Sequence, residues 1–143
     1  MFKNILLPID IAHESSWKKA LPAALELARN FDSRLTLVTV VDADPNSGWL
    51  QGGTGKKLID DYVAKTTKQL ADFSEKHIPS EIDATQLVKI GSVYREIIHA
   101  VDEVQPDLIV MAAHRPSLKE YLLGVNAARA ARHAECSILI IRE

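Results

Sequence analysis

The chain has 143 residues, of which 47% are hydrophobic and 25% are charged, and this fits a single domain over 1–143 with a substantial core. Lysine and arginine number 17 against 19 acidic residues, so the net charge of -2 supplies no basic field for nucleic acid or anionic lipid. The apolar run near the N-terminus is too short for a signal sequence or a membrane span, so we expect a cytoplasmic protein. A single cysteine, Cys136, excludes an internal disulfide and is expected to be a small packing residue.

Five apolar, β-branched runs alternate with segments of helical periodicity. The runs cover 4–10, 34–42, 84–90, 108–113 and 137–142. The helical segments cover 15–30, 57–77, 93–104 and 126–134. Strands joined through helices pair in parallel by right-handed crossovers, so this order predicts a three-layer α/β fold with a doubly wound, five-stranded parallel sheet. The common strand order of such a sheet is 3-2-1-4-5.

Glycine and proline mark several ends of these elements. Pro22 falls inside the first helical pattern, where it should either kink the helix or set its start. Gly91 and Ser92 predict the turn from the third strand into the third helix, with Ser92 as the N-cap. Pro106 follows that helix and should close it.

The strand order also predicts where a ligand would bind. In doubly wound sheets, ligands bind beyond the carboxyl ends of the strands, at the point where the strand order reverses. In the order 3-2-1-4-5 this point lies between the first and fourth strands, whose following loops begin at Asp10 and Ala112. Gly124 precedes the fourth helix, and the first free N–H groups there, including those of Val125 and Asn126, would form an anion site.

Several ordered segments together resemble the universal stress protein family over essentially the whole chain. They are ILLPID (5–10), LTLVTVVD (35–42), IGSVYREII (90–98), DLIVMAAHRP (107–116) and LLGVNAARAARHAECSILIIR (122–142). The tail is most similar to a branch whose loop contains His-Arg-Pro and which binds adenine nucleotides. The resemblance implies an adenine nucleotide alpha hydrolase-like fold, a bound ATP or AMP with or without Mg²⁺, a homodimer, and a stress-response regulator without a well-defined reaction of its own.

The glycine pattern of the nucleotide-binding members is only partly present. These members carry Gly-x-x-Gly, a spacer, and then Gly-Ser or Gly-Thr. Here Ala112 and Arg115 occupy the first two glycine positions, and Gly124 is followed by Val125. Ala112 adds one methyl group, whereas Arg115 would either clash with the phosphates or hold them through its guanidinium group. Val125 keeps its backbone N–H but lacks the hydroxyl, and the missing hydrogen bond should weaken binding by about 0.5 to 1.5 kcal/mol.

The remaining pocket positions match the family better. The resemblance places Asp10 near the adenine, where its carboxylate can accept a hydrogen bond from the exocyclic amine. The competing interpretation is that Asp10 caps the first helix. The switch-point rule favours the site. Pro8 and Ile9 would wall the base, and the backbone of Val40 would bind it. The expected contacts are completed by Met111, His114 and Asn126.

Catalytic and metal-binding patterns are missing from the sequence. It has no metal-ligand spacing such as His-Glu-x-x-His, and no set of nucleophile, base and orienting group, so we predict neither a metal site nor catalytic residues. Three functions remain open: a nucleotide-binding regulator, a slow ATPase or phosphotransfer enzyme, and a dimeric protein-interaction module that has lost the nucleotide. Asp10, Gly124 and Asn126 favour the first, whereas Arg115 and Val125 favour the third.

The C-terminal strand predicts self-association. In the order 3-2-1-4-5 this strand lies at an edge of the sheet, yet residues 138–141 are apolar on both alternating faces. An exposed edge of this kind would aggregate, so it should be covered. The family resemblance implies antiparallel pairing with the same strand of a second copy, which gives a two-fold interface.

Overall fold

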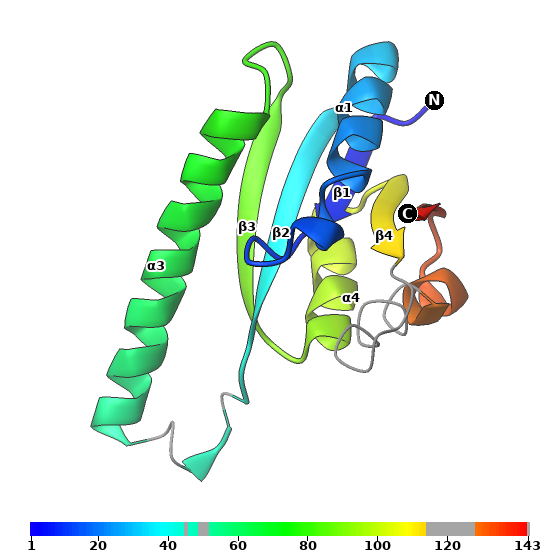
Figure 1. Cartoon of the computed structure of the whole chain (residues 1–143). Helices are drawn as coiled ribbons and strands as arrows, with labels where there is room; N and C mark the ends of the chain where they lie inside the picture. The colour runs from blue at the N-terminus through cyan, green and yellow to red at the C-terminus, as the bar shows by residue number, and fades with distance from the viewer. Residues whose placement is uncertain (45, 49–51, 114–127, 143) are drawn as a thin grey trace.

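The computed structural model describes residues 1–44, 46–48, 52–113 and 128–142, and its strands alternate with helices (Figure 1). The strands are β1 (Asn4–Pro8), β2 (Arg34–Asp42), β3 (Ala84–Gly91), β4 (Leu108–Ala113) and β5 (Ser137–Arg142). The helices are η1 (Glu14–Ser16, a 3-10 turn), α1 (Ala20–Phe31), α3 (Gly53–His77) and α4 (Val93–Val104), and residues 128–133 are also helical.

The five strands form one parallel sheet in the order β3-β2-β1-β4-β5, which confirms the predicted fold class and strand order. β1 lies at the centre, and its Ile5, Leu6 and Leu7 are fully buried. Helices cover both faces of a parallel sheet, so its central strands can be apolar on both sides. This explains why the run at the start of the chain does not alternate between apolar and polar residues.

Two separate apolar clusters hold the three layers together. One cluster lies between the sheet and the pair α1 and α3, and includes Leu21 of α1 and Leu70 and Phe73 of α3. The other lies on the opposite face, where Ile97 of α4 and Ala130 pack against the sheet. Each helix therefore buries one apolar stripe, while the loops that follow the strands gather at the carboxyl edge of the sheet.

The ends of several elements differ from those predicted. β1 stops at Pro8 instead of continuing to Asp10, because the chain turns there into η1. α1 begins at Ala20, so Pro22 lies in its first turn and sets the start of the helix without kinking it. α3 begins at Gly53, four residues earlier than the predicted 57.

The turn between β3 and α4 contains the glycine that its backbone requires. Gly91 has φ +143, a conformation that residues with a Cβ rarely adopt, and an added Cβ would lie 2.9 Å from Glu96 Cγ. Ser92 occupies the N-cap position with extended backbone, as predicted, but its side chain makes no capping hydrogen bond. The side chain of Glu96, in the first turn of α4, therefore packs against the backbone of Gly91.

Candidate functional site at the carboxyl edge

The pairing between β1 and β4 ends earlier than the pairing on either side of it. β1 pairs with β2 along its whole length, and β4 pairs with β5 along its whole length. Between β1 and β4, only Ile5 with Leu108 and Leu6 with Ile109 are partners. The two strands thus cease to pair toward their carboxyl ends, and they do so where the strand order reverses. This is the position at which doubly wound sheets bind their ligands.

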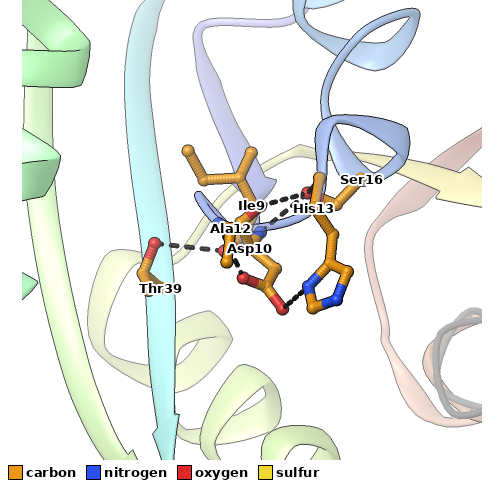
Figure 2. Close-up of polar contacts among 6 residues, drawn as sticks. All are labelled: Ile9, Asp10, Ala12, His13, Ser16 and Thr39. Atoms are coloured by element: carbon orange, nitrogen blue, oxygen red, sulfur yellow. Dashed lines mark hydrogen bonds and ion pairs between the residues drawn. The ribbon is translucent and has the colours of Figure 1, made fainter.

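Asp10 follows β1 at this position, and its own loop holds its side chain (Figure 2). Oδ1 accepts a hydrogen bond from the backbone N–H of Ala12 at 3.1 Å, and Oδ2 lies 2.8 Å from Nδ1 of His13. The side chain is nevertheless 55% exposed. Because each oxygen of an ionised carboxylate can accept more than one hydrogen bond, Asp10 can bind a further donor without giving up these contacts.

Ser16 and Thr39 fix the backbone around Asp10. Ser16 is 2% exposed, and its hydroxyl accepts from the N–H of Asp10 at 2.8 Å. The same Oγ lies 2.8 Å from the carbonyl oxygens of Asp10 and His13, so it donates to one of them at a time. Thr39 of β2 donates from Oγ1 to the carbonyl of Ile9 at 3.1 Å. The loop is thereby tied both to itself and to the neighbouring strand (Figure 2).

Asp10 does not cap the first long helix, so that competing interpretation is wrong. The residue at the N-cap position of α1 is Lys19, and no side chain makes a capping hydrogen bond there. The carboxylate of Asp10 instead closes an Asx turn onto Ala12, and η1 lies between this turn and α1.

The backbone of Val40 points into the same region. Val38 accepts a hydrogen bond from the N–H of Ile9 at 2.9 Å, so its backbone faces β1. Strand geometry repeats every second residue, and the N–H and C=O of Val40 therefore face the same way, beyond the last residue of β1. Its half-buried side chain packs against the cluster around α4.

Other predicted site residues form the packed base of this edge. Ile9, Met111 and Ala112 are 5%, 1% and 5% exposed, and Pro8 is buried as the last residue of β1. Their side chains present little surface to a ligand, so they support the exposed groups above them. The predicted contacts at His114, Arg115, Gly124, Val125 and Asn126 lie outside the described residues.

The sequence signals did not single out His13, Ser16 or Thr39. An Asp directly after a strand is typical of an Asx turn, and this pattern alone indicates the contact to Ala12. The contacts of the other three side chains depend on the path of the loop and on the neighbour that β2 provides, which no local pattern records.

The described residues contain neither a metal-binding cluster nor a membrane-spanning helix, and the single cysteine is a packing residue. Within 1–44, 46–48, 52–113 and 128–142, no group of three His, Cys, Asp or Glu side chains could hold a metal ion. In the same ranges, no helix is long and apolar enough to cross a membrane. Cys136 is half-buried and packs against the cluster around α4, and burial raises the pKa of its thiol, which disfavours the reactive thiolate.

Comparison with known proteins identifies the family. A model described as the universal stress protein family matches residues 1–142. The chain belongs to the universal stress protein family. Universal stress protein G of Escherichia coli O157:H7 is 26% identical over 145 residues, covering 99% of this chain and 100% of the relative. The earlier resemblance is therefore confirmed.

Solved structures of the family share the fold. The universal stress protein UspA from Lactobacillus plantarum superimposes with a TM-score of 0.77 at 22% identity, covering 98% of this chain and 97% of that one. A universal stress protein from Arabidopsis thaliana, solved with AMP bound, gives a TM-score of 0.59 at 18% identity, with 99% and 92% coverage. Similarity at these identities establishes the common architecture of the sheet and its helices.

Proposed function

We propose that this universal stress protein binds an adenine nucleotide, ATP or AMP, beyond the carboxyl ends of β1 and β4, and acts as a cytoplasmic, nucleotide-dependent regulator in a stress response. The observation that carries the proposal is the early end of the β1–β4 pairing, with the exposed, loop-held carboxylate of Asp10 directly beside it. The AMP bound to the Arabidopsis relative, which has the same fold, supports this choice of ligand.

Asp10 and Val40 supply complementary groups for adenine. The carboxylate of Asp10 accepts a hydrogen bond from the exocyclic amine of the base. The N–H and C=O of Val40 offer one donor and one acceptor to the ring edge. Guanine carries a carbonyl where adenine carries this amine, and a carbonyl facing a carboxylate would leave both acceptors unpaired. The arrangement therefore favours adenine over guanine.

Calorimetry with ATP, AMP and GTP tests the proposal, with and without Mg²⁺. We expect ATP or AMP to bind more tightly than GTP, and Asp10→Ala to weaken adenine nucleotide binding by about 1.5 to 3 kcal/mol, as for a lost hydrogen bond to a charged group. Asp102→Ala is the matched control, because Asp102 is an exposed carboxylate near the end of α4, which leads into the amino end of β4 and so lies away from the carboxyl edge. It should leave binding unchanged.

The outcome that contradicts the proposal is equally definite. If neither ATP nor AMP binds at millimolar concentration, the nucleotide function fails and the protein-interaction module takes its place. We also propose that the nucleotide is held without being hydrolysed. Steady formation of ADP from ATP, lost in Asp10→Ala, would instead favour the slow ATPase.

We further propose that the protein forms a homodimer through β5. Among the described residues this strand pairs on one side only, with β4, and its Leu139 is 36% exposed. Antiparallel pairing with β5 of a second copy would satisfy the free backbone groups of both strands and cover their apolar side chains.

A further inference from the structure

Ten successive residues in the first half of α3, which follow the buried Gly55, lack a buried side chain. No residue from Lys56 to Lys65 is buried, and the next residue, Thr66, is 6% exposed. The second half behaves differently, because Leu70 and Phe73 belong to the apolar cluster under the sheet. In Figure 1 the start of α3, at the lower left, lies apart from the labelled strands and helices. Helices gain most of their stability from packing of one face, so an unpacked stretch of this length is marginal alone.

Large apolar side chains line this unpacked stretch. Leu58 and Tyr62 are 51% and 56% exposed. They lie one turn apart on the same face of α3, and the half-exposed pair Ile59 and Val63 forms the adjacent row. We call these four residues the α3 patch. Neighbouring apolar side chains of this kind mark interaction sites more often than single exposed residues do.

A row of alternating charges borders the α3 patch. Lys57, Asp61 and Lys65 follow one another at intervals of one turn beside Leu58 and Tyr62. In the described part of the chain, none of these three side chains makes a hydrogen bond or an ion pair. The row therefore carries an unused pattern of positive, negative and positive charge along one edge of an apolar surface.

We propose that the α3 patch is a self-association surface, on which α3 of a second copy of this chain packs antiparallel about a two-fold axis. In a two-fold antiparallel helix pair, the same edge of each helix meets the other in reversed order. Asp61 of one copy then meets Lys57 or Lys65 of the other, and each such contact occurs twice. The apolar rows of the two copies cover one another at the centre. The surface is separate from the edge of β5, and the proposal does not depend on nucleotide binding.

The charge row allows a test that does not require the exact register. Asp61→Lys makes the row entirely basic, whereas Lys57→Glu with Lys65→Glu makes it entirely acidic. Every chain also carries Leu139→Lys, which places a cation on the exposed edge of β5, so that pairing through this strand does not contribute. Self-association is measured by sedimentation velocity over a concentration series.

We expect the chain with the natural charge row to dimerise, and each altered row to raise the Kd by about tenfold through like-charge repulsion. An equal mixture of the basic and acidic variants should recover or exceed the original association as one-to-one heterodimers. Glu75→Lys, which changes the charge of an exposed residue in the packed half of α3 by the same amount as Asp61→Lys, should leave the Kd unchanged. A monomeric parent chain, or a mixture that associates no better than its components, would overturn the proposal.

Disulfide trapping locates the contact independently of charge. In a Cys136→Ala chain, Leu58→Cys should form a disulfide-linked dimer under mild oxidation if Asp61 meets Lys57, because the two-fold axis then passes near position 59. If Asp61 meets Lys65, the axis passes near position 63 and Tyr62→Cys should be the variant that cross-links. Ala64→Cys is the matched control, because Ala64 is exposed on the side of α3 opposite to the α3 patch. Equal cross-linking of the patch and control variants, or cross-linking of Ala64→Cys alone, would place the contact elsewhere and refute the α3 patch.

Discussion

β1 and β5 have similar apolar sequences but very different environments. In β1, Ile5, Leu6 and Leu7 are fully buried, whereas no residue of β5 is buried and Leu139 is 36% exposed. The difference arises from position, because β1 lies between β2 and β4 while β5, within the part of the chain that the structure describes, pairs only with β4. An apolar run thus predicts a strand of the sheet without saying whether its neighbours come from the same chain. The edge strand resembles a central strand that lacks one neighbour.

The two strands should differ most in how much stability is lost when a leucine side chain is shortened. Leu7→Ala should lower the free energy of unfolding by about 2 to 5 kcal/mol, because it removes a fully buried side chain and leaves a cavity. Leu139→Ala deletes the same atoms from the exposed edge and should cost less than about 1 kcal/mol in the monomer. Urea denaturation at low protein concentration measures both. Equal losses would show that β5 is as well covered as β1 and would remove the contrast.

We expect a smaller loss of stability when the contacts at the start of β1 are removed. Asp107, just before β4, accepts hydrogen bonds from the backbone N–H groups of Lys3 at 2.8 Å and Asn4 at 3.1 Å. Asp107→Ala leaves both donors without this partner, so we expect a loss of about 1 to 2 kcal/mol for this half-buried site. Asp102→Ala, at an exposed position on α4, is the control. A loss no greater than that of the control would mean that water replaces the carboxylate.

Much of the sheet could be predicted from the sequence alone. The strands at 34–42, 108–113 and 137–142 have the predicted bounds, because apolar β-branched runs end sharply at polar or small residues. The strand predicted at 4–10 is two residues too long, because Ile9 is apolar and buried but already belongs to the turn after β1. The hydrophobic pattern therefore predicts which residues are buried, and it does not predict where strand pairing ends.

The site could be predicted less completely. Asp10 was placed at the carboxyl edge by strand order, which is a property of the whole sheet. The bonds of its carboxylate to Ala12 and His13, and the buried hydroxyl of Ser16, depend on how one short loop folds back on itself. Such contacts join residues without periodic spacing, so no pattern of apolar and polar residues indicates them.

Leu139→Lys should have the smallest effect on the free energy of unfolding and the clearest effect on assembly through β5. Leu139→Lys places a charged group on an exposed edge, which natural proteins use to block unwanted strand pairing. In the monomer the change should stay within about 0.5 kcal/mol, because the long aliphatic stem of lysine can still cover the sheet. In the proposed β5 dimer, however, the two strands would bring two like charges and their bound water into an apolar contact. Light scattering tests this in a chain whose α3 charge row is entirely acidic, so that the α3 patch does not contribute; we expect that chain to be dimeric and its Leu139→Lys variant to be monomeric at the same concentration. Thr67→Lys, which adds the same charge to an exposed position on α3, should leave that dimer intact. If Leu139→Lys leaves the assembly unchanged while the charge reversals on α3 reduce it, the α3 patch alone joins the copies, and the open edge of β5 must be tolerated by the single chain.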